Sequence, residues 1–159
     1  MRLSPAIWPL ICVLVYTSST CAAQLPSEVD VRSAYCEAVL KDMLRKHEAV
    51  LGTLTEPQFR KALQKEIVAI EANLRLLQRY LLPRLRDLDP SGLTAAMQSG
   101  QEDAAQRHEH ERRCAGTCLL ALVGSIDLTK YVACLGSCYQ KNPAWNRTRV
   151  CESLHWLPF

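Results

Sequence analysis

Four cysteines form two pairs with identical spacing and could take part in sulfur chemistry. Cys114 and Cys118 are four residues apart, and Cys134 and Cys138 repeat that spacing. Residues four apart lie on one face of an α-helix, so each pair forms a stripe of two thiols. If the chain reverses at residues 124–127, the stripes face each other in antiparallel order. Cys114 then meets Cys138 and Cys118 meets Cys134, which predicts a helical hairpin joined by two disulfides.

Thiols with this spacing also suit two other kinds of chemistry. Four thiolates in two pairs could bind zinc, because structural zinc sites commonly separate paired ligands by two to four residues. Reactive thiols of a redox protein are a third interpretation. An oxidising compartment favours disulfides, so the choice depends on where the chain is sent.

Residues 1–23 predict a secretory signal peptide. Arg2 supplies a positive start, residues 6–16 are almost wholly apolar, and residues 21–23 (Cys-Ala-Ala) offer a cleavage site. The apolar run is shorter than a typical membrane-spanning helix, and an uncleaved signal anchor is the alternative interpretation. We therefore expect a secreted, extracellular protein.

Removing this signal peptide reduces the eight cysteines to six, because Cys12 and Cys21 leave with it. An even count in an exported chain indicates a disulfide framework. The hairpin uses four of the six, so Cys36 and Cys151 are expected to form the third bond. That bond would hold the first helix of the mature chain to the C-terminal tail.

Apolar residues at helical spacing predict two long helices before the hairpin. One stripe runs from Cys36 to Val50 and a longer one from Phe59 to Leu81. Pro83 is expected to end the second helix, because the residue before a proline is disfavoured in helical conformation. Packing inside the protein is the main interpretation of the second stripe, and a partner-binding seam is the alternative.

These features predict an all-α, disulfide-stapled helical bundle of about four helices with a C-terminal twin Cys-x3-Cys helical hairpin. The 159 residues suffice for one domain. We expect a single helical domain over residues 24–159, comprising long helices at about 28–51 and 56–82, a linker at 83–100, the stapled hairpin at 101–141 and a tail at 142–159. The start of the hairpin, residues 101–112, is polar on every side, so we expect it to project from the core into solvent.

Two histidines at the start of the hairpin, His108 and His110, lie among glutamates and suggest metal binding. Residues two apart on a helix point roughly 200° apart, so these two cannot chelate one ion from a regular helix. We interpret them as part of a solvated polar face. No metal site and no cofactor are predicted.

The sequence carries no catalytic motif that we can identify. It has no Gly-x-Ser-x-Gly, no His-Glu-x-x-His and no glycine-rich phosphate loop. With all six mature cysteines paired, no thiol is left as a nucleophile. We therefore expect a protein that is not an enzyme.

Two short motifs are candidates for processing. Asn146-Arg147-Thr148 is an N-glycosylation acceptor sequence, which predicts a glycan at Asn146 on a surface loop. Arg112-Arg113 is a dibasic pair of the kind that convertases cut. Because the pair is expected to lie within a helix beside a disulfide, we expect it to stay uncut.

Aromatic residues near the C-terminus are the candidates for contact with a partner. Trp145, Trp156 and Phe159 lie in the tail, where they either close the core or present an apolar surface. A basic cluster at the end of the second helix is a candidate for weak contact with anionic glycans, and comprises Arg75, Arg79, Arg84 and Arg86. No feature predicts nucleic-acid binding or stable membrane insertion.

The stretch from Cys114 to Cys138 resembles, in its cysteine spacing, the helical hairpins of two groups. These are the small chaperones of the mitochondrial intermembrane space and the plant α-hairpinin defence peptides. The signal peptide, the acceptor Asn146 and the long preceding helices depart from both groups. We interpret the likeness as shared geometry and assign no family.

Together these features predict a secreted protein that binds another protein outside the cell, as a cytokine- or hormone-like ligand or a secreted effector. An extracellular carrier of lipids or small ligands, or a membrane-active helical protein, is the alternative. A carrier should enclose a cavity lined by the apolar stripe of the second helix and by the tryptophans, whereas a ligand should have a filled core.

Overall fold

The computed structural model describes residues 23–120 and 128–158. The expected signal peptide up to residue 22, the expected turn at 124–127 and Phe159 lie outside the described residues. The described part contains five α-helices, and a short 3-10 helix (Arg149–Cys151) follows the last of them. The α-helices are α1 (Glu28–Thr53), α2 (Pro57–Leu81), α3 (Pro90–Leu120), α4 (Leu128–Gln140) and α5 (Pro143–Thr148).

The all-α class is therefore confirmed for the described residues, which form no strand beyond one isolated bridge between Gln24 and Leu88. Both long helices begin and end within two residues of their expected bounds. None of the helices among these residues is long and apolar enough to cross a membrane.

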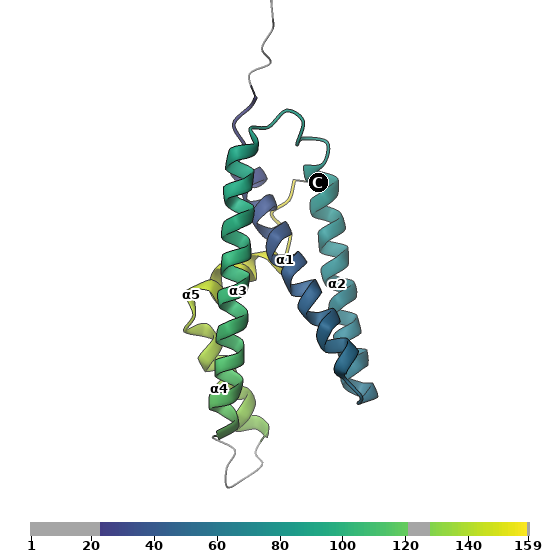
Figure 1. Ribbon diagram of the computed structural model, residues 1–159, viewed down its shortest axis with the longest axis vertical. Coiled ribbons are helices and arrows are strands. Elements are labelled where there is room, and N and C mark those ends of the chain that lie inside the picture. Colours follow the sequence, from purple (N-terminus) through teal and green to yellow (C-terminus); the bar gives the residue numbers. More distant parts are fainter. Residues whose placement is uncertain (1–22, 121–127, 159) are drawn as a thin grey trace, which may run out of the picture.

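Helix α1 lies between α2 and α3 and packs against both (Figure 1). From there α2 and the far end of α3 diverge, so that the molecule has two arms. One arm consists of α1 and α2, and the other consists of α3 and α4, with α5 against the middle of α3. Helix α4 adds no buried residue, so it does not complete a closed four-helix core.

The main hydrophobic core lies where α1, α2 and the tail meet. Val39 and Leu40 of α1 face the α2 stripe, and Leu157 of the tail covers them. The disulfide between Cys36 and Cys151 passes through this core, and both cysteines are fully buried. The bond spans 115 residues of sequence, so it closes the longest loop of the three disulfides. The stripe expected on the second helix is thus used for internal packing from Ile67 to Leu81, whereas Phe59 at its start is 56% exposed.

Helix α1 begins with a capping box. Ser27 Oγ accepts from the backbone of Asp30, and the Asp30 carboxylate accepts from the backbone of Ser27. Arg84 Nε donates to the same carboxylate at 2.8 Å, which ties the end of α2 to the start of α1. Burial alone would raise the pKa of Asp30, but its hydrogen bonds with Ser27 and Arg84 outweigh burial and lower it.

The prediction of a linker at 83–100 is wrong for most of that range, because α3 already begins at Pro90. Asp89 accepts from the backbone N–H of Ser91 at 3.2 Å, which satisfies one of the unpaired groups at the helix start. Gly100 lies where α3 crosses α1, and a Cβ at this position would come within 2.5 Å of the carbonyl oxygen of Tyr35. This glycine therefore permits close helix packing and does not mark a loop.

Two glycines of α3 should respond in opposite ways to alanine. Gly100→Ala is expected to lower the free energy of unfolding by about 1–3 kcal/mol, because α1 and α3 must move apart. Gly116→Ala, where nothing lies within 4 Å of the added atom, should raise it by about 0.5–1 kcal/mol through helix propensity. Urea denaturation of both variants measures the two changes, and equal effects would contradict the close helix crossing at Gly100.

Candidate functional site

Two disulfides join α3 to α4, in the pairing that the cysteine spacing predicts. Cys114 is bonded to Cys138 and Cys118 to Cys134, and in both bonds the Cα atoms are 5.8 Å apart. Cys114 and Cys118 are fully buried, whereas their partners on α4 are half-buried. The two bonds therefore fix α4 along one side of α3.

The end of this hairpin presents exposed apolar side chains. Leu119 of α3 and Leu128 and Val132 of α4 are 54%, 69% and 59% exposed. Leu119 follows Cys118 along the chain, and Leu128 and Val132 precede Cys134, so all three lie between the two cysteines of this bond in sequence. We call these three residues the hairpin tip. Because no residue of α4 is buried, these side chains contribute little to the hydrophobic core.

A polar network connects α3 to α5 and the tail behind the hairpin. Arg107 is only 8% exposed, and its guanidinium donates to Glu111 at 2.8 Å, to Glu152 at 2.9 Å and to Thr148 Oγ1 at 3.2 Å. It also lies over the ring of Trp145, 4.0 Å from the ring centroid. A buried guanidinium is tolerated here because carboxylates, a hydroxyl and an aromatic face all surround it.

Asp103, one turn before Arg107, forms a second ion pair, in which the carboxylate is buried and the guanidinium of Arg147 is half-exposed. Arg147 Nε donates to its carboxylate at 2.8 Å, and the Tyr35 hydroxyl donates to it at 2.8 Å. The hydrogen bond from Arg147 lowers the pKa of Asp103 although burial opposes it. Burial and the hydrogen bond to Asp103 raise the pKa of Tyr35. The expectation that residues 101–112 project into solvent is thus wrong for one face of α3, because α1 and α5 cover the side that carries Asp103, Ala104 and Arg107. Most other residues of this range are exposed.

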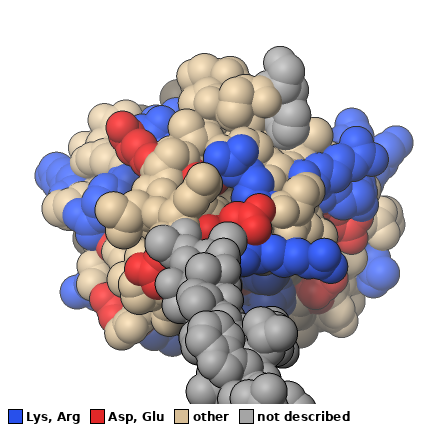
Figure 2. All heavy atoms as spheres, turned by 90° about the horizontal axis from the view of Figure 1, so that it is seen from above, with Lys and Arg blue, Asp and Glu red and all other residues tan. Residues whose placement is uncertain are grey.

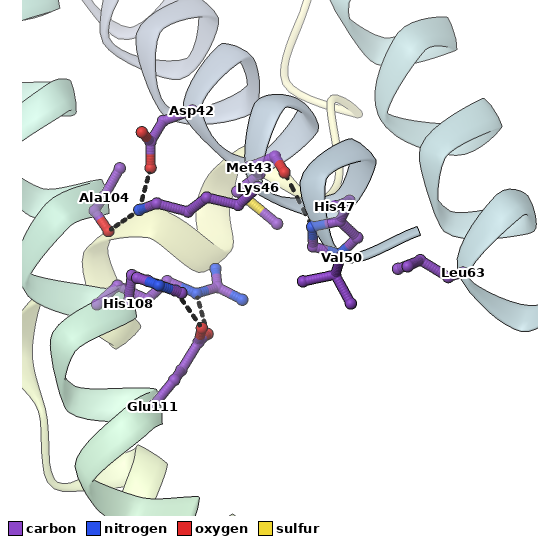
Figure 3. Close-up of a pocket in the computed structure, with 10 residues that line it drawn as sticks. Asp42, Met43, Lys46, His47, Val50, Leu63, Ala104, His108 and Glu111 are labelled. Atoms are coloured by element: carbon purple, nitrogen blue, oxygen red, sulfur yellow. Dashed lines mark hydrogen bonds and ion pairs between the residues drawn. The ribbon is translucent and has the colours of Figure 1, made fainter. Parts of the chain in front are cut away.

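A cleft separates the two arms next to this network (Figure 3). Its narrow part has a volume of about 180 Å³ and lies between Met43 and Val50 of α1, Leu63 of α2 and His108 of α3. A wider part of about 630 Å³ continues from it, bounded by residues that include Ile70 and Tyr139. The cleft is open to solvent and combines apolar walls with charged groups.

Polar groups at the cleft are engaged with each other or with backbone. Lys46 Nζ donates to the carbonyl of Ala104 at 3.3 Å and pairs with Asp42. His47 Nδ1 donates to the carbonyl of Met43 at 2.9 Å, and its Nε2 lies 3.2 Å from Glu66. These contacts suit a structural role that links the arms, and none of them pairs a nucleophile with a base.

The tryptophans of the tail are half-buried and have internal partners. Trp145 stacks on Tyr139 with ring centroids 4.7 Å apart. Trp156 Nε1 donates to the carbonyl of Val150 at 3.3 Å, and the guanidinium of Arg32 lies 5.3 Å from its ring. Both rings therefore close the inside of the fold. Sequence reasoning pointed to these aromatics and missed the aliphatic hairpin tip, whose exposure depends on how α3 and α4 pack and not on a local pattern.

The acceptor Asn146 is exposed but lies in α5, not in the expected loop. Its side-chain amide donates to the carbonyl of Gln140 at 3.3 Å. Thr148 of the same triplet is fully buried and donates to the carbonyl of Ala144 at 2.9 Å. The triplet thus has a structural role besides its acceptor chemistry.

The structure divides the basic cluster expected at the end of the second helix. Arg84 is bound to Asp30 and lies 5.0 Å from the ring of Tyr80. Arg75 lies 3.6 Å from Glu71, while Arg79 and Arg86 are exposed. Figure 2 shows Lys and Arg spread over several parts of this end of the molecule, with Asp and Glu between them.

One group of side chains has ligand atoms close enough to suggest a metal. Nitrogen or sulfur atoms of His110, Cys114 and Cys138 all lie within 4.8 Å of one another. Both sulfurs belong to one disulfide, so neither offers the thiolate that a metal requires. His108 does not join the group, since its contact is with Glu111 at 3.9 Å.

Comparison of the chain with models of known protein families, with curated proteins and with solved structures finds no match. The function is therefore argued from the site alone.

Asp103→Asn tests the ion pair between the buried Asp103 and Arg147. A carboxyl whose pKa is lowered in the folded state stabilises the fold above its unfolded pKa of about 3.9, and this stabilisation is lost as pH falls through the folded value. The variant should lose about 1–2 kcal/mol of unfolding free energy at pH 7, because it removes the charge that Arg147 binds. The loss is not larger, because Arg147 is half-exposed and solvent screens the pair. The difference from wild type should shrink below about pH 4.

Denaturant unfolding at several pH values measures this, with the exposed Asp87→Asn as control. A difference between wild type and Asp103→Asn that is the same at pH 7 and pH 3 would contradict the ion-pair account.

Proposed function

We propose that this protein is secreted, has no enzymatic activity and binds another protein outside the cell through its hairpin tip. The observation that carries the proposal is the exposure of Leu119, Leu128 and Val132 on a hairpin that two disulfides hold in place. Leu119 and Val132 lie within two residues of the Cys118–Cys134 bond in sequence, and exposed apolar patches on a folded protein commonly mark interaction sites. We define the role as that of a cytokine- or hormone-like ligand or a secreted effector.

The disulfides make this surface suited to binding. A flexible segment loses conformational entropy when it binds, and a cross-linked one has already lost most of it on folding. Helix α4 has 13 residues and buries none of them, so its own packing would not hold it in register. The two bonds supply that order and present the apolar side chains in a fixed arrangement.

A lipid carrier is the alternative class, and among its described residues the structure lacks the enclosed apolar cavity that would favour it. The apolar stripe of α2 is used in the core, where Leu74 and Leu77 are 7% and 0% exposed. The cleft that remains is open and has Arg107, Glu66 and Glu111 on its walls. A fatty acyl chain needs an enclosed apolar site, and protein binding needs only the exposed surface.

Export is the second part of the proposal. Three disulfides stabilise a fold of this size best in an oxidising compartment, and the N-terminal residues have the composition of a signal peptide. We place a glycan on the exposed Asn146. The exposed Arg75, Arg79 and Arg86 remain the candidates for weak contact with an anionic glycan. Arg84 is excluded by its bond to Asp30.

The double variant Leu128→Gln/Val132→Gln tests the hairpin tip. Each apolar side chain buried in an interface contributes about 1.5–3 kcal/mol, so the affinity of the labelled protein for cells that bind it saturably should fall at least about tenfold. Val68→Gln on α2 is the matched control, because Val68 and Val132 are both 59% exposed on helices. Equal affinities of the double variant and the control would contradict this placement of the contact.

A further inference from the structure

We propose that the Cys114–Cys138 disulfide is a thiol–disulfide exchange site. An external thiol attacks Cys138, and His110 assists the departure of Cys114. This inference does not depend on the proposed binding function. It concerns a chemical property that distinguishes this bond from the other two disulfides.

His110 lies one helical turn before Cys114 on α3 and contacts both halves of the hairpin. Its Nε2 atom is 2.9 Å from the carbonyl oxygen of Cys138 and 3.3 Å from the sulfur of Cys114. A carbonyl oxygen can only accept a hydrogen bond, so Nε2 carries the hydrogen. This single N–H donates to the carbonyl of Cys138 in the intact protein, and the sulfur of Cys114 at 3.3 Å is close enough to share it when charge develops there.

This donor favours Cys114 as the leaving group. When a disulfide is attacked, one sulfur departs as a thiolate, and departure is faster when that thiolate is more stable. A hydrogen bond to an ionised acceptor is stronger than one to a neutral acceptor, so the contact from His110 strengthens as charge develops on Cys114.

The difference in burial between the two cysteines also favours attack at Cys138 and departure of Cys114. Cys114 is fully buried, whereas Cys138 is half-buried and is the residue that a thiol can approach. An incoming thiolate therefore forms a bond to the sulfur of Cys138 while the bond between Cys138 and Cys114 breaks. Cys114 leaves with the electron pair as a thiolate that the N–H of His110 stabilises, and it then takes a proton from solvent. The products are a mixed disulfide at Cys138 and a free thiol at Cys114.

The other two disulfides differ in the features that the reaction uses. Cys36 and Cys151 are both fully buried, so neither is open to attack. Cys118 has Cys114, not a histidine, one turn before it on α3. When Cys114–Cys138 opens, the Cys118–Cys134 bond still ties α4 to α3. The exchange therefore loosens one end of α4 and leaves the hairpin in one piece.

Limited reaction of the folded, oxidised protein with glutathione tests the proposal. Free thiols are trapped with an alkylating reagent at successive times, and peptide mapping then identifies which bond has opened. We expect Cys114–Cys138 to open before the other two, with glutathione on Cys138 and the alkyl group on Cys114. Opening of another bond first, or glutathione on Cys114, would overturn the proposal.

Two histidine variants test the role of the N–H donor in the same assay. His110→Ala should slow the opening of Cys114–Cys138 by about three- to tenfold, since the leaving thiolate loses its donor. His108→Ala is the matched control, because His108 lies on the same helix and its contact is with Glu111. His110→Gln keeps an N–H donor and should be slowed less than His110→Ala, which separates donation from a loss of fold. Equal rates in His110→Ala and His108→Ala would refute the role of His110.

Discussion

Covalent bonds between sulfur atoms hold this protein together where packing alone does not. Helix α4 buries no residue, yet it lies in register against α3 because Cys114–Cys138 and Cys118–Cys134 fix it at two points. The third bond, Cys36–Cys151, closes a loop of 115 residues and holds the tail over the core. In the chain-entropy model such a long loop contributes about 5 kcal/mol, against about 3 kcal/mol for the shorter ones.

The two ends of the second arm differ in the side chains that they present. Near α5, the buried Asp103 and Arg107 bind groups that lie 41–45 residues later in the chain, so α3 is joined to the tail by charge and hydrogen bonds. Beyond Cys118 the described end of α3 presents the exposed Leu119 to solvent. The polar network positions the arm, the disulfides stiffen it, and the exposed hairpin tip is the surface that we propose for partner contact.

Much of the fold could be predicted from local pattern, and the rest depended on contacts distant in sequence. The spacing of Cys114, Cys118, Cys134 and Cys138 led to the pairing that the structure has, because that spacing acts within two helices. The close packing at Gly100 and the burial of Asp103 depend on α1 and α5, whose positions no local pattern reveals. A glycine or an aspartate in a polar stretch looks like loop or solvent-facing surface until the neighbouring helix is known.

Amide hydrogen exchange on a variant lacking both hairpin disulfides tests the central claim most directly. In a protein with all four hairpin cysteines changed to serine, we expect the amides of α4 to exchange nearly as fast as in an unfolded chain. Amides of α1 and α2 around Leu40 and Leu77 should stay protected, because the Cys36–Cys151 bond and the core are intact. Persistent protection of α4, or loss of protection throughout the protein, would contradict the account.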